Sequence, residues 1–373
     1  MFSTYFDPQK INALLSASKP STNEVEHLLL LKKNSLAQVA KLILASSQDE
    51  LRQLIIDAAK KSRTMVWQNQ LFLMPPLYIS NGDSSKGGCL DHCLYCPWRN
   101  GNVPKEKLLR LTPEETRVES AALITMGYGD IELVAATDPL LFHGEKAAQY
   151  IAAAKNAGAR HVGVNFFPLS TREDYKMLAR EGCTFSIVWQ ETYDPEVYKT
   201  MHTTGPKSNM LYRLDAHDRA LQGGIPAVGI AFLGGLTDWR YETLAAIQHA
   251  RYLQKKYNAH IIFGMPRWKF GQGLCMKTAP QFYGDQEYEL VGALYSLSIP
   301  GSLVWFSTRE HFDLSARCAR GGGCVFTLDC STEVGGYSRQ NGFAQFPVYS
   351  CSYQEGVGWL KKIGFTPQIH LPW

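Results

Sequence analysis

The chain has 373 residues, of which 45% are hydrophobic and 19% are charged. This composition is that of a folded protein and excludes an intrinsically disordered one. The formal net charge of +4, from 38 basic and 34 acidic residues, is too small to indicate a nucleic-acid partner.

No apolar run approaches the ~18 residues that a membrane-spanning helix needs, so we expect no membrane association. The first ten residues, MFSTYFDPQK, do not place a basic segment before an apolar one, so we expect no secretory signal. Nine cysteines without an export signal indicate a reducing compartment, and we expect the cytoplasm. In such a compartment clustered thiols indicate a metal site or catalysis before disulfides.

The first 66 residues show the apolar spacing of helices. Three stripes, at 25–30, 36–43 and 51–58, place apolar side chains on one helix face. The stretch STNE at 21–24 offers N-cap candidates for the first of them. We therefore expect a helical segment at 1–66 that packs on a larger unit.

From Leu71 onward, short β-rich runs alternate with helical ones. The predicted strands are 71–80, 131–136, 161–167, 185–190, 227–232, 260–263, 303–306 and 324–328. The predicted helices are 113–126, 145–157, 171–181, 206–222, 239–257, 283–297, 309–318 and 354–363. Crossovers of a dozen or more residues are typical of a parallel sheet.

Eight such strands favour an α/β fold of the (β/α)8 TIM-barrel type. An open, doubly wound sheet is the alternative, because strand order cannot be read from a sequence. We expect the barrel at 67–330, after the helical segment at 1–66, and a C-terminal cap at 331–373.

The most specific motif is CLDHCLYC, which spaces Cys89, Cys93 and Cys96 as CxxxCxxC. It follows the predicted strand 71–80, and loops at the C-terminal ends of barrel strands build active sites. Three thiolates in one short loop suit an iron–sulfur cube and leave one iron open. The alternative is a structural zinc site closed by His92 or by a distant cysteine.

The aromatic residue Tyr95 directly precedes the third cysteine, and this arrangement resembles the radical S-adenosylmethionine (SAM) superfamily. The resemblance implies that Cys89, Cys93 and Cys96 hold a 4Fe-4S cluster whose open iron is chelated by SAM. Reductive cleavage of SAM in that superfamily yields a 5′-deoxyadenosyl radical, which abstracts hydrogen from a substrate. The resemblance also implies a one-electron donor such as flavodoxin or ferredoxin.

Further stretches resemble the aromatic amino acid lyase branch of this superfamily, from about Phe72 to near the C-terminus. They are WQETY at 189–193, Tyr198, MH at 201–202, GPK at 205–207, YRL at 212–214, DRA at 218–220, Gly229, GGL at 234–236, RYET at 240–243, PR at 266–267, FSTRE at 306–310 and VGGY at 334–337. The branch contains 2-iminoacetate synthase, the tyrosine lyase of hydrogenase maturation, and a tryptophan lyase.

For the cofactor, the resemblance implies four residues besides the cysteines. Tyr95 is expected near the adenine, Glu191 at the ribose or amino group, and Arg213 at the methionine carboxylate. Thr137 stands where related enzymes have a glutamate, which implies altered contacts to the SAM amino group. The alternatives are a core aromatic for Tyr95, a structural ion pair for Glu191 and a solvated helix position for Arg213.

For the substrate, Arg309 resembles the arginine that clamps the amino acid carboxylate, and Arg267 is the competing candidate. Ser307 is expected as a polar neighbour. The alternative for either arginine is a salt bridge at the barrel rim. We expect no second cluster at Cys318, Cys324 and Cys330, since this chain has no second CxxC.

The predicted activity is cleavage of a free aromatic amino acid, with tyrosine giving 4-cresol and dehydroglycine (2-iminoacetate). A tryptophan lyase that makes an indole product is the first alternative, because Ser331 replaces a basic residue of the tyrosine lyases. A diverged radical SAM enzyme with another small substrate is the second. Outside enzymes, the motif is also compatible with a structural zinc or electron-transfer site.

Overall fold

The computed structural model describes residues 1–31, 33–274, 276–339, 342–349 and 351–373. In this part of the chain one parallel sheet has the strand order β10-β1-β9-β8-β7-β6-β5-β4-β3-β2. The strands are β1 (Gln70–Leu73), β2 (Pro76–Ser80), β3 (Ile131–Ala135), β4 (Val162–Asn165), β5 (Cys183–Glu191), β6 (Ala227–Phe232), β7 (His260–Met265), β8 (Leu303–Phe306), β9 (Val325–Phe326) and β10 (Thr366–Gln368). Strands β2 to β9 follow each other in chain order, as in a TIM-type α/β fold.

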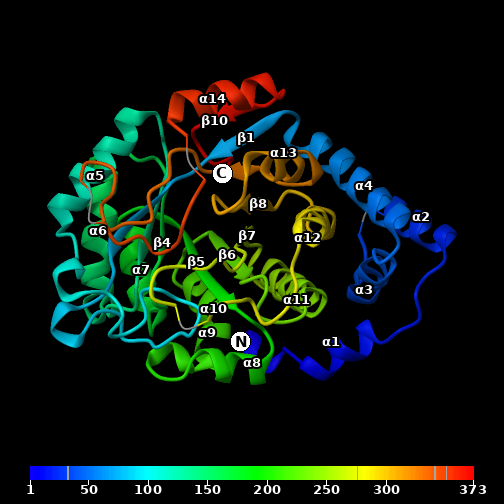
Figure 1. The fold of residues 1–373 in the computed structure, drawn as a ribbon, viewed down its shortest axis with the longest axis horizontal. Helices are drawn as coiled ribbons and strands as arrows, with labels where there is room; N and C mark the ends of the chain where they lie inside the picture. The colour runs from blue at the N-terminus through cyan, green and yellow to red at the C-terminus, as the bar shows by residue number, and fades with distance from the viewer. Residues whose placement is uncertain (32, 275, 340–341, 350) are drawn as a thin grey trace.

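Helices surround the strands (Figure 1). They are α1 (Pro8–Leu15), α2 (Thr22–Leu30), α3 (Leu36–Ala45), α4 (Asp49–Trp67), α5 (Pro113–Met126), α6 (Gly144–Asn156), α7 (Arg172–Arg180), α8 (Pro195–Met201), α9 (Met210–Leu214), α10 (Ala216–Gln222), α11 (Trp239–Tyr257), α12 (Asp285–Ser298), α13 (Phe312–Gly321) and α14 (Tyr353–Lys362). Five 3-10 turns join them, η1 (Phe2–Thr4), η2 (Ser84–Lys86), η3 (Lys105–Lys107), η4 (Pro139–Phe142) and η5 (Pro206–Ser208), as counted in the described residues. None of the described helices is both long and apolar enough to cross a membrane.

The N-terminal helices pack on the outside of the barrel helices, with α4 against α12 and α13 and with α3 against α11 (Figure 1). Capping contacts define the starts of α2 and α3, since the Ser21 hydroxyl accepts from the Glu24 N–H and Ser35 forms a capping box with Gln38. The extreme N-terminus is anchored as well, because the ring of Phe2 stacks on His249 with centroids 3.7 Å apart.

The predicted strand 71–80 is two strands in the structure, which is a correction. The consecutive residues Pro75 and Pro76 lack N–H groups and interrupt the ladder between β1 and β2. β1 pairs with β9, whereas β2 pairs with β3, so this one segment contacts both ends of the β2–β9 series. Above the break, a single bridge joins Tyr78 to Val334, and no β2–β9 ladder occurs among the described strands.

The predicted helix 206–222 is also divided, into η5, α9 and α10. Asn209 adopts an extended backbone, and its side chain accepts from the Tyr212 N–H, which starts a new helix there. Sequence patterning also missed α8, whose N-cap Asp194 accepts from two backbone N–H groups.

One end of the barrel interior is filled by apolar side chains. The buried members of this cluster are Phe72, Met74, Phe185, Ile187, Ala227, Ile262, Leu303, Trp305, Cys324, Val325 and Leu371. Gly163 on β4 makes room for this packing, because a Cβ there would lie 1.9 Å from Cε2 of Phe185. The filling leaves open space only toward the C-terminal ends of the strands, where the candidate site lies.

Candidate active site

A cavity of about 230 Å³ lies inside the barrel among the C-terminal ends of its strands. Its walls come from β2, β3, β4, β5, β7 and β8 and from the loop that follows β2. Of the ten site residues expected from the sequence, nine line this cavity: Cys89, Cys93, Tyr95, Cys96, Thr137, Glu191, Arg213, Ser307 and Arg309. Arg267 does not.

The loop after β2 is fixed to the barrel by buried polar contacts. Asn81 donates to the Lys107 carbonyl at 2.8 Å and accepts from the Leu109 N–H at 2.8 Å. Deeper in the loop, the buried Asp91 carboxylate accepts from the Lys207 N–H at 2.8 Å and from the Thr137 hydroxyl. The bonds of Asp91 hold the cysteine motif against the end of β3 and against η5.

The three cysteines of the motif are free thiols that face the cavity together. Cys89 and Cys93 are buried and Cys96 is partly buried. Burial raises the pKa of each thiol to about 12, so a thiolate here needs a nearby cation. Iron supplies that cation, and three convergent sulfur donors in one loop are the donor set of a 4Fe-4S cluster.

A single-ion site finds no support in the described residues. No three of their His, Cys, Asp and Glu side chains are placed to share one metal ion. A cluster has a different requirement, because each cysteine binds its own iron atom. His92 faces the Thr203 hydroxyl, with Nδ1 3.3 Å from it, and lies outside the cavity lining.

Glu191 and Arg213 bring opposite charges to the cavity wall. Glu191 ends β5 after a register shift and has φ of +72°, a strained value for this residue type. Its carboxylate binds the Lys207 ammonium at 2.6 Å. Arg213 donates from Nη2 to the Trp189 carbonyl at 2.6 Å, and its buried Nε has no partner in the described chain. A buried guanidinium N–H with no partner fits the carboxylate of SAM.

Tyr95 and Thr137 have protein partners of their own. The Tyr95 hydroxyl lies 2.8 Å from Nε2 of His202, so its ring, rather than its hydroxyl, is left for a ligand. The Thr137 hydroxyl donates to Asp91. A cavity-lining carboxylate therefore stands next to Thr137, on the cysteine loop instead of on β3.

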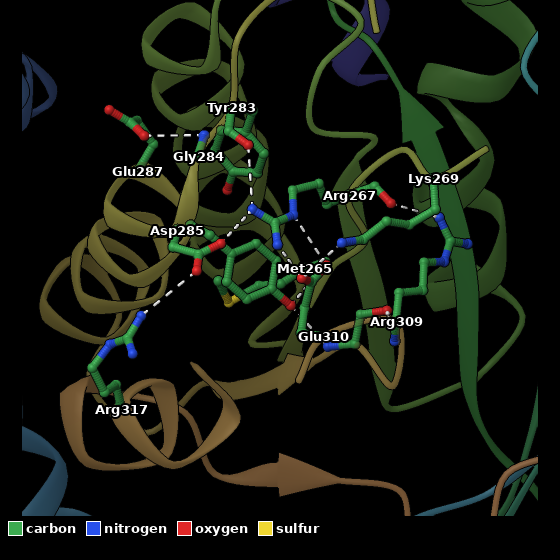
Figure 2. A network of polar contacts seen from close by, with 12 residues as sticks. Met265, Arg267, Lys269, Tyr283, Gly284, Asp285, Glu287, Arg309, Glu310 and Arg317 are labelled. Atoms are coloured by element: carbon green, nitrogen blue, oxygen red, sulfur yellow. Dashed lines mark hydrogen bonds and ion pairs between the residues drawn. The ribbon is translucent and has the colours of Figure 1, made fainter. Parts of the chain in front are cut away.

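Arg309 follows β8 and lines the cavity, and Figure 2 shows its guanidinium beside the Arg267 carbonyl. Its Nη1 donates to the Arg267 carbonyl at 3.1 Å, and one face of the group lies on the Phe346 ring, 3.6 Å from the centroid. Its Nε is buried without a partner among the described residues. Burial lowers the pKa of Arg309, so an anion placed beside it would be bound strongly. Ser307 accepts from the Arg309 N–H at 3.2 Å and shapes this corner.

The contacts of Arg267 favour the rim salt bridge over a role at the substrate, which stays a prediction. Figure 2 places its guanidinium among Asp285, Tyr283 and Glu310, apart from that of Arg309. Nη1 donates to Asp285 at 2.8 Å, and Nε and Nη2 both donate to the buried carboxylate of Glu310. Lys269 adds a second cation, 3.2 Å from Glu310. Arg267 is thus the salt bridge at the rim that was the alternative interpretation.

Sequence reasoning missed several residues that line the cavity. Two of them, Asp91 in CLDHCLYC and Lys207 in GPK, lie inside motifs that the sequence analysis singled out. Their place in these motifs could have identified them. Glu132 is an acid within an otherwise apolar strand, which also marks it as unusual. The aromatic lining from β5 and β8, Trp189 and Trp305, carries no sequence signal that separates it from core packing.

The family model of the radical SAM superfamily matches residues 84–247, the region that holds the cysteine loop and the first half of the cavity. Within this region the chain is similar to the radical SAM superfamily. The cofactors of this superfamily are a 4Fe-4S cluster and SAM, and the three free thiols with the unpaired Arg213 are the groups that fit them.

Among curated relatives of this protein, the 2-iminoacetate synthase of Escherichia coli is 27% identical over 235 residues. That match covers 63% of this chain and 59% of the relative. The 2-iminoacetate synthase of Salmonella typhimurium is 26% identical over 204 residues, which cover 54% and 52%. The matches thus span between half and 60% of the curated relatives.

Solved structures agree with this position in the superfamily. HydG, a maturase of the FeFe-hydrogenase, superposes with a TM-score of 0.88 at 28% identity, over 97% of this chain and 80% of that one. HydG from Carboxydothermus hydrogenoformans gives 0.86 at 28% identity, over 99% and 85%. The resemblance to the aromatic amino acid lyase branch is confirmed.

The contacts of Glu310 with Arg267 and Lys269 yield a prediction about the stability of the fold. We expect Glu310→Gln to lower the free energy of unfolding by about 3 kcal/mol, because Arg267 loses its buried anion. Asp285→Asn removes the exposed partner of the same guanidinium and should cost less than about 1 kcal/mol. Urea unfolding of both variants checks this, and equal losses would contradict it.

Proposed function

We propose that this protein is a radical SAM lyase that cleaves the side chain from a free aromatic amino acid, with tyrosine giving 4-cresol and dehydroglycine. The observation that carries the proposal is the buried Nε of Arg309, which has no partner among the described residues, in the cavity that the three motif thiols also line. The name of the curated relatives supports the product, since 2-iminoacetate is dehydroglycine.

Cys89, Cys93 and Cys96 would hold the cluster. Bound there, the cluster and SAM supply a 5′-deoxyadenosyl radical that abstracts a hydrogen atom from the substrate. Arg213 would bind the SAM carboxylate through its free Nε. Glu191 would attract the cationic part of SAM while it keeps Lys207 beside it.

We infer that two residues take over the role of the glutamate that related enzymes have at this position. Thr137 occupies its position, and the adjacent carboxylate of Asp91 lines the same wall. In the proposed enzyme, the Thr137 oxygen and Asp91 would together accept from the SAM amino group. The negative charge that strengthens this hydrogen bond would then come from Asp91 on the cysteine loop, and not from a residue that follows β3.

The substrate would lie between Arg309 and the aromatic walls. Arg309 would clamp its carboxylate with two parallel N–H donors, as an arginine fork does. Trp189 and Trp305, whose rings meet edge to face at 6.4 Å, would pack against its side chain. These walls exclude water, which limits side reactions of a reactive radical.

The test is anaerobic turnover. The cluster is reconstituted and reduced, and SAM is added with tyrosine, with tryptophan or with neither. We expect 5′-deoxyadenosine and 4-cresol from tyrosine alone. In D2O, deuterium in the 5′-deoxyadenosine would locate the abstraction at the exchangeable amino group. A tryptophan-dependent indole product would reassign the protein to the tryptophan lyases. An intact cluster that turns over neither amino acid would refute the proposal.

A further inference from the structure

Glu132 is an acidic residue that the proposed chemistry does not use. It lies on β3 among apolar neighbours, is 3% exposed, and lines the cavity. The one hydrogen bond printed for its side chain within the described residues comes from Nδ2 of Asn165, at 3.0 Å. Burial raises the pKa of Glu132 to about 8, and no basic side chain of the described residues offsets this. At neutral pH it therefore presents both an O–H donor and an oxygen acceptor.

Glu132 lies at the deep end of the cavity. It is three residues before the end of β3, about 10 Å down the barrel, whereas Arg309 follows the end of β8. On the β4 side its ladder partner is Gly163, which does not line the cavity and sits against the ring of Phe185, and on the β2 side it is Pro76, which does line the cavity. The carboxyl group thus marks the boundary between the cavity and the apolar filling below it.

The wall between the two ends of the cavity is largely aromatic. Trp189 and Trp305 contribute from β5 and β8, Phe166 and Phe167 follow β4, and Tyr78 contributes from β2. A flat, apolar side chain suits these walls. A molecule whose carboxylate is bound at the mouth would point the tip of that side chain toward the deep end.

We propose that Glu132, together with Asn165, binds the polar group at the far end of the substrate's aromatic ring, namely the phenol hydroxyl of tyrosine. This inference rests on the proposed function. A protonated carboxyl can donate a hydrogen bond to the phenol oxygen and accept one from the phenol O–H, and the neighbouring amide offers a further donor and acceptor. Neither group places a net charge in the barrel. The pair makes Glu132 a specificity-determining residue, since a ring without a polar tip leaves the carboxyl unsatisfied.

The test uses matched amino acids that differ only at the polar tip. Tyrosine is compared with phenylalanine, and tryptophan with 3-benzothienylalanine, which lacks the indole N–H. Binding is measured by titration calorimetry on the reconstituted protein with SAM and an oxidised cluster, so that no turnover occurs. We expect the preferred amino acid to bind at least 100-fold more tightly than its partner, because sites built around a substrate hydroxyl discriminate this strongly.

Two variants assign the discrimination to this residue. Glu132→Leu should reduce the preference to less than about fivefold by weakening the polar-tipped amino acid, since a leucine offers no hydrogen bond. Glu132→Gln keeps a donor and an acceptor and should retain most of the preference. Glu173→Gln, an exposed acid on α7, is the matched control and should change nothing. The melting temperature of Glu132→Leu should not fall, because it removes a buried polar group.

The outcomes separate the inference from the proposed function. If neither tyrosine nor tryptophan binds or supports 5′-deoxyadenosine formation in the wild-type protein, the proposed function fails. If one of them turns over but Glu132→Leu retains the full preference for the polar tip, only the role of Glu132 fails. Tighter binding of lysine than of either aromatic amino acid would also overturn it, because Glu132 would then bind a side-chain ammonium group and not a hydroxyl.

Discussion

Replacing Cys93 with alanine is expected to abolish both iron binding and SAM cleavage. The wild-type protein should hold about four irons per chain after anaerobic reconstitution, and the variant almost none. Cys93 is 5% exposed and lines the cavity together with Cys89 and Cys96. Formation of 5′-deoxyadenosine should fall at least 10³-fold, because the reductive step needs the cluster. Iron content, absorbance near 400 nm and product mass spectrometry check this.

The matched controls are two of the cysteines at which the sequence predicts no second cluster. Cys324→Ala and Cys330→Ala remove buried thiols outside the cavity lining and should each cost about 1–2 kcal/mol of stability. Neither should change the iron content. Loss of iron from either control, or a Cys93→Ala protein that still cleaves SAM, would show that the cluster is held by other ligands.

The parallel α/β fold could be predicted because its signal is local and repeated. Strands β6 and β8 have the predicted bounds, since each is a short apolar run between clear helical patterns. The break in 71–80 was missed because the apolar run continues through Pro75, and the effect of a lost N–H depends on which neighbour the strand pairs with. Which strands pair with each other at the two ends of the sheet depends on tertiary contacts, and a local pattern does not show it.

The candidate site also contains residues that a local pattern identifies and residues that only tertiary contacts identify. The cysteine motif is contiguous, so its spacing carries its chemistry. Arg267 and Arg309 both follow barrel strands and look equivalent in the sequence. The difference lies in Glu310, which neighbours Arg309 in the chain yet turns its carboxylate to Arg267. No sequence pattern shows which arginine an adjacent acid will neutralise. The contact of Asp91 with Thr137 joins two segments 46 residues apart and was equally hidden.

The second large effect is expected at Arg309. Arg309→Leu should lower kcat/KM for the amino acid by 10²–10³, chiefly through KM, since losing one partner of a desolvated charge pair costs about 2–5 kcal/mol. Arg309→Lys should recover only part of this, because an ammonium lacks the planar fork. Cluster content should stay at the wild-type level, since Arg309 comes from β8 and not from the cysteine loop.

Tyramine, which is tyrosine without its carboxylate, makes this prediction specific to one contact. The wild-type protein should bind tyrosine far more tightly than tyramine, and Arg309→Leu should bind the two about equally. Arg267→Gln is the matched control, because its guanidinium is held by Glu310 and Asp285. It should lose stability and keep the preference for tyrosine. If Arg267→Gln erased that preference and Arg309→Leu did not, the carboxylate clamp would be the other arginine, and the rim network of Figure 2 would have to open to admit substrate.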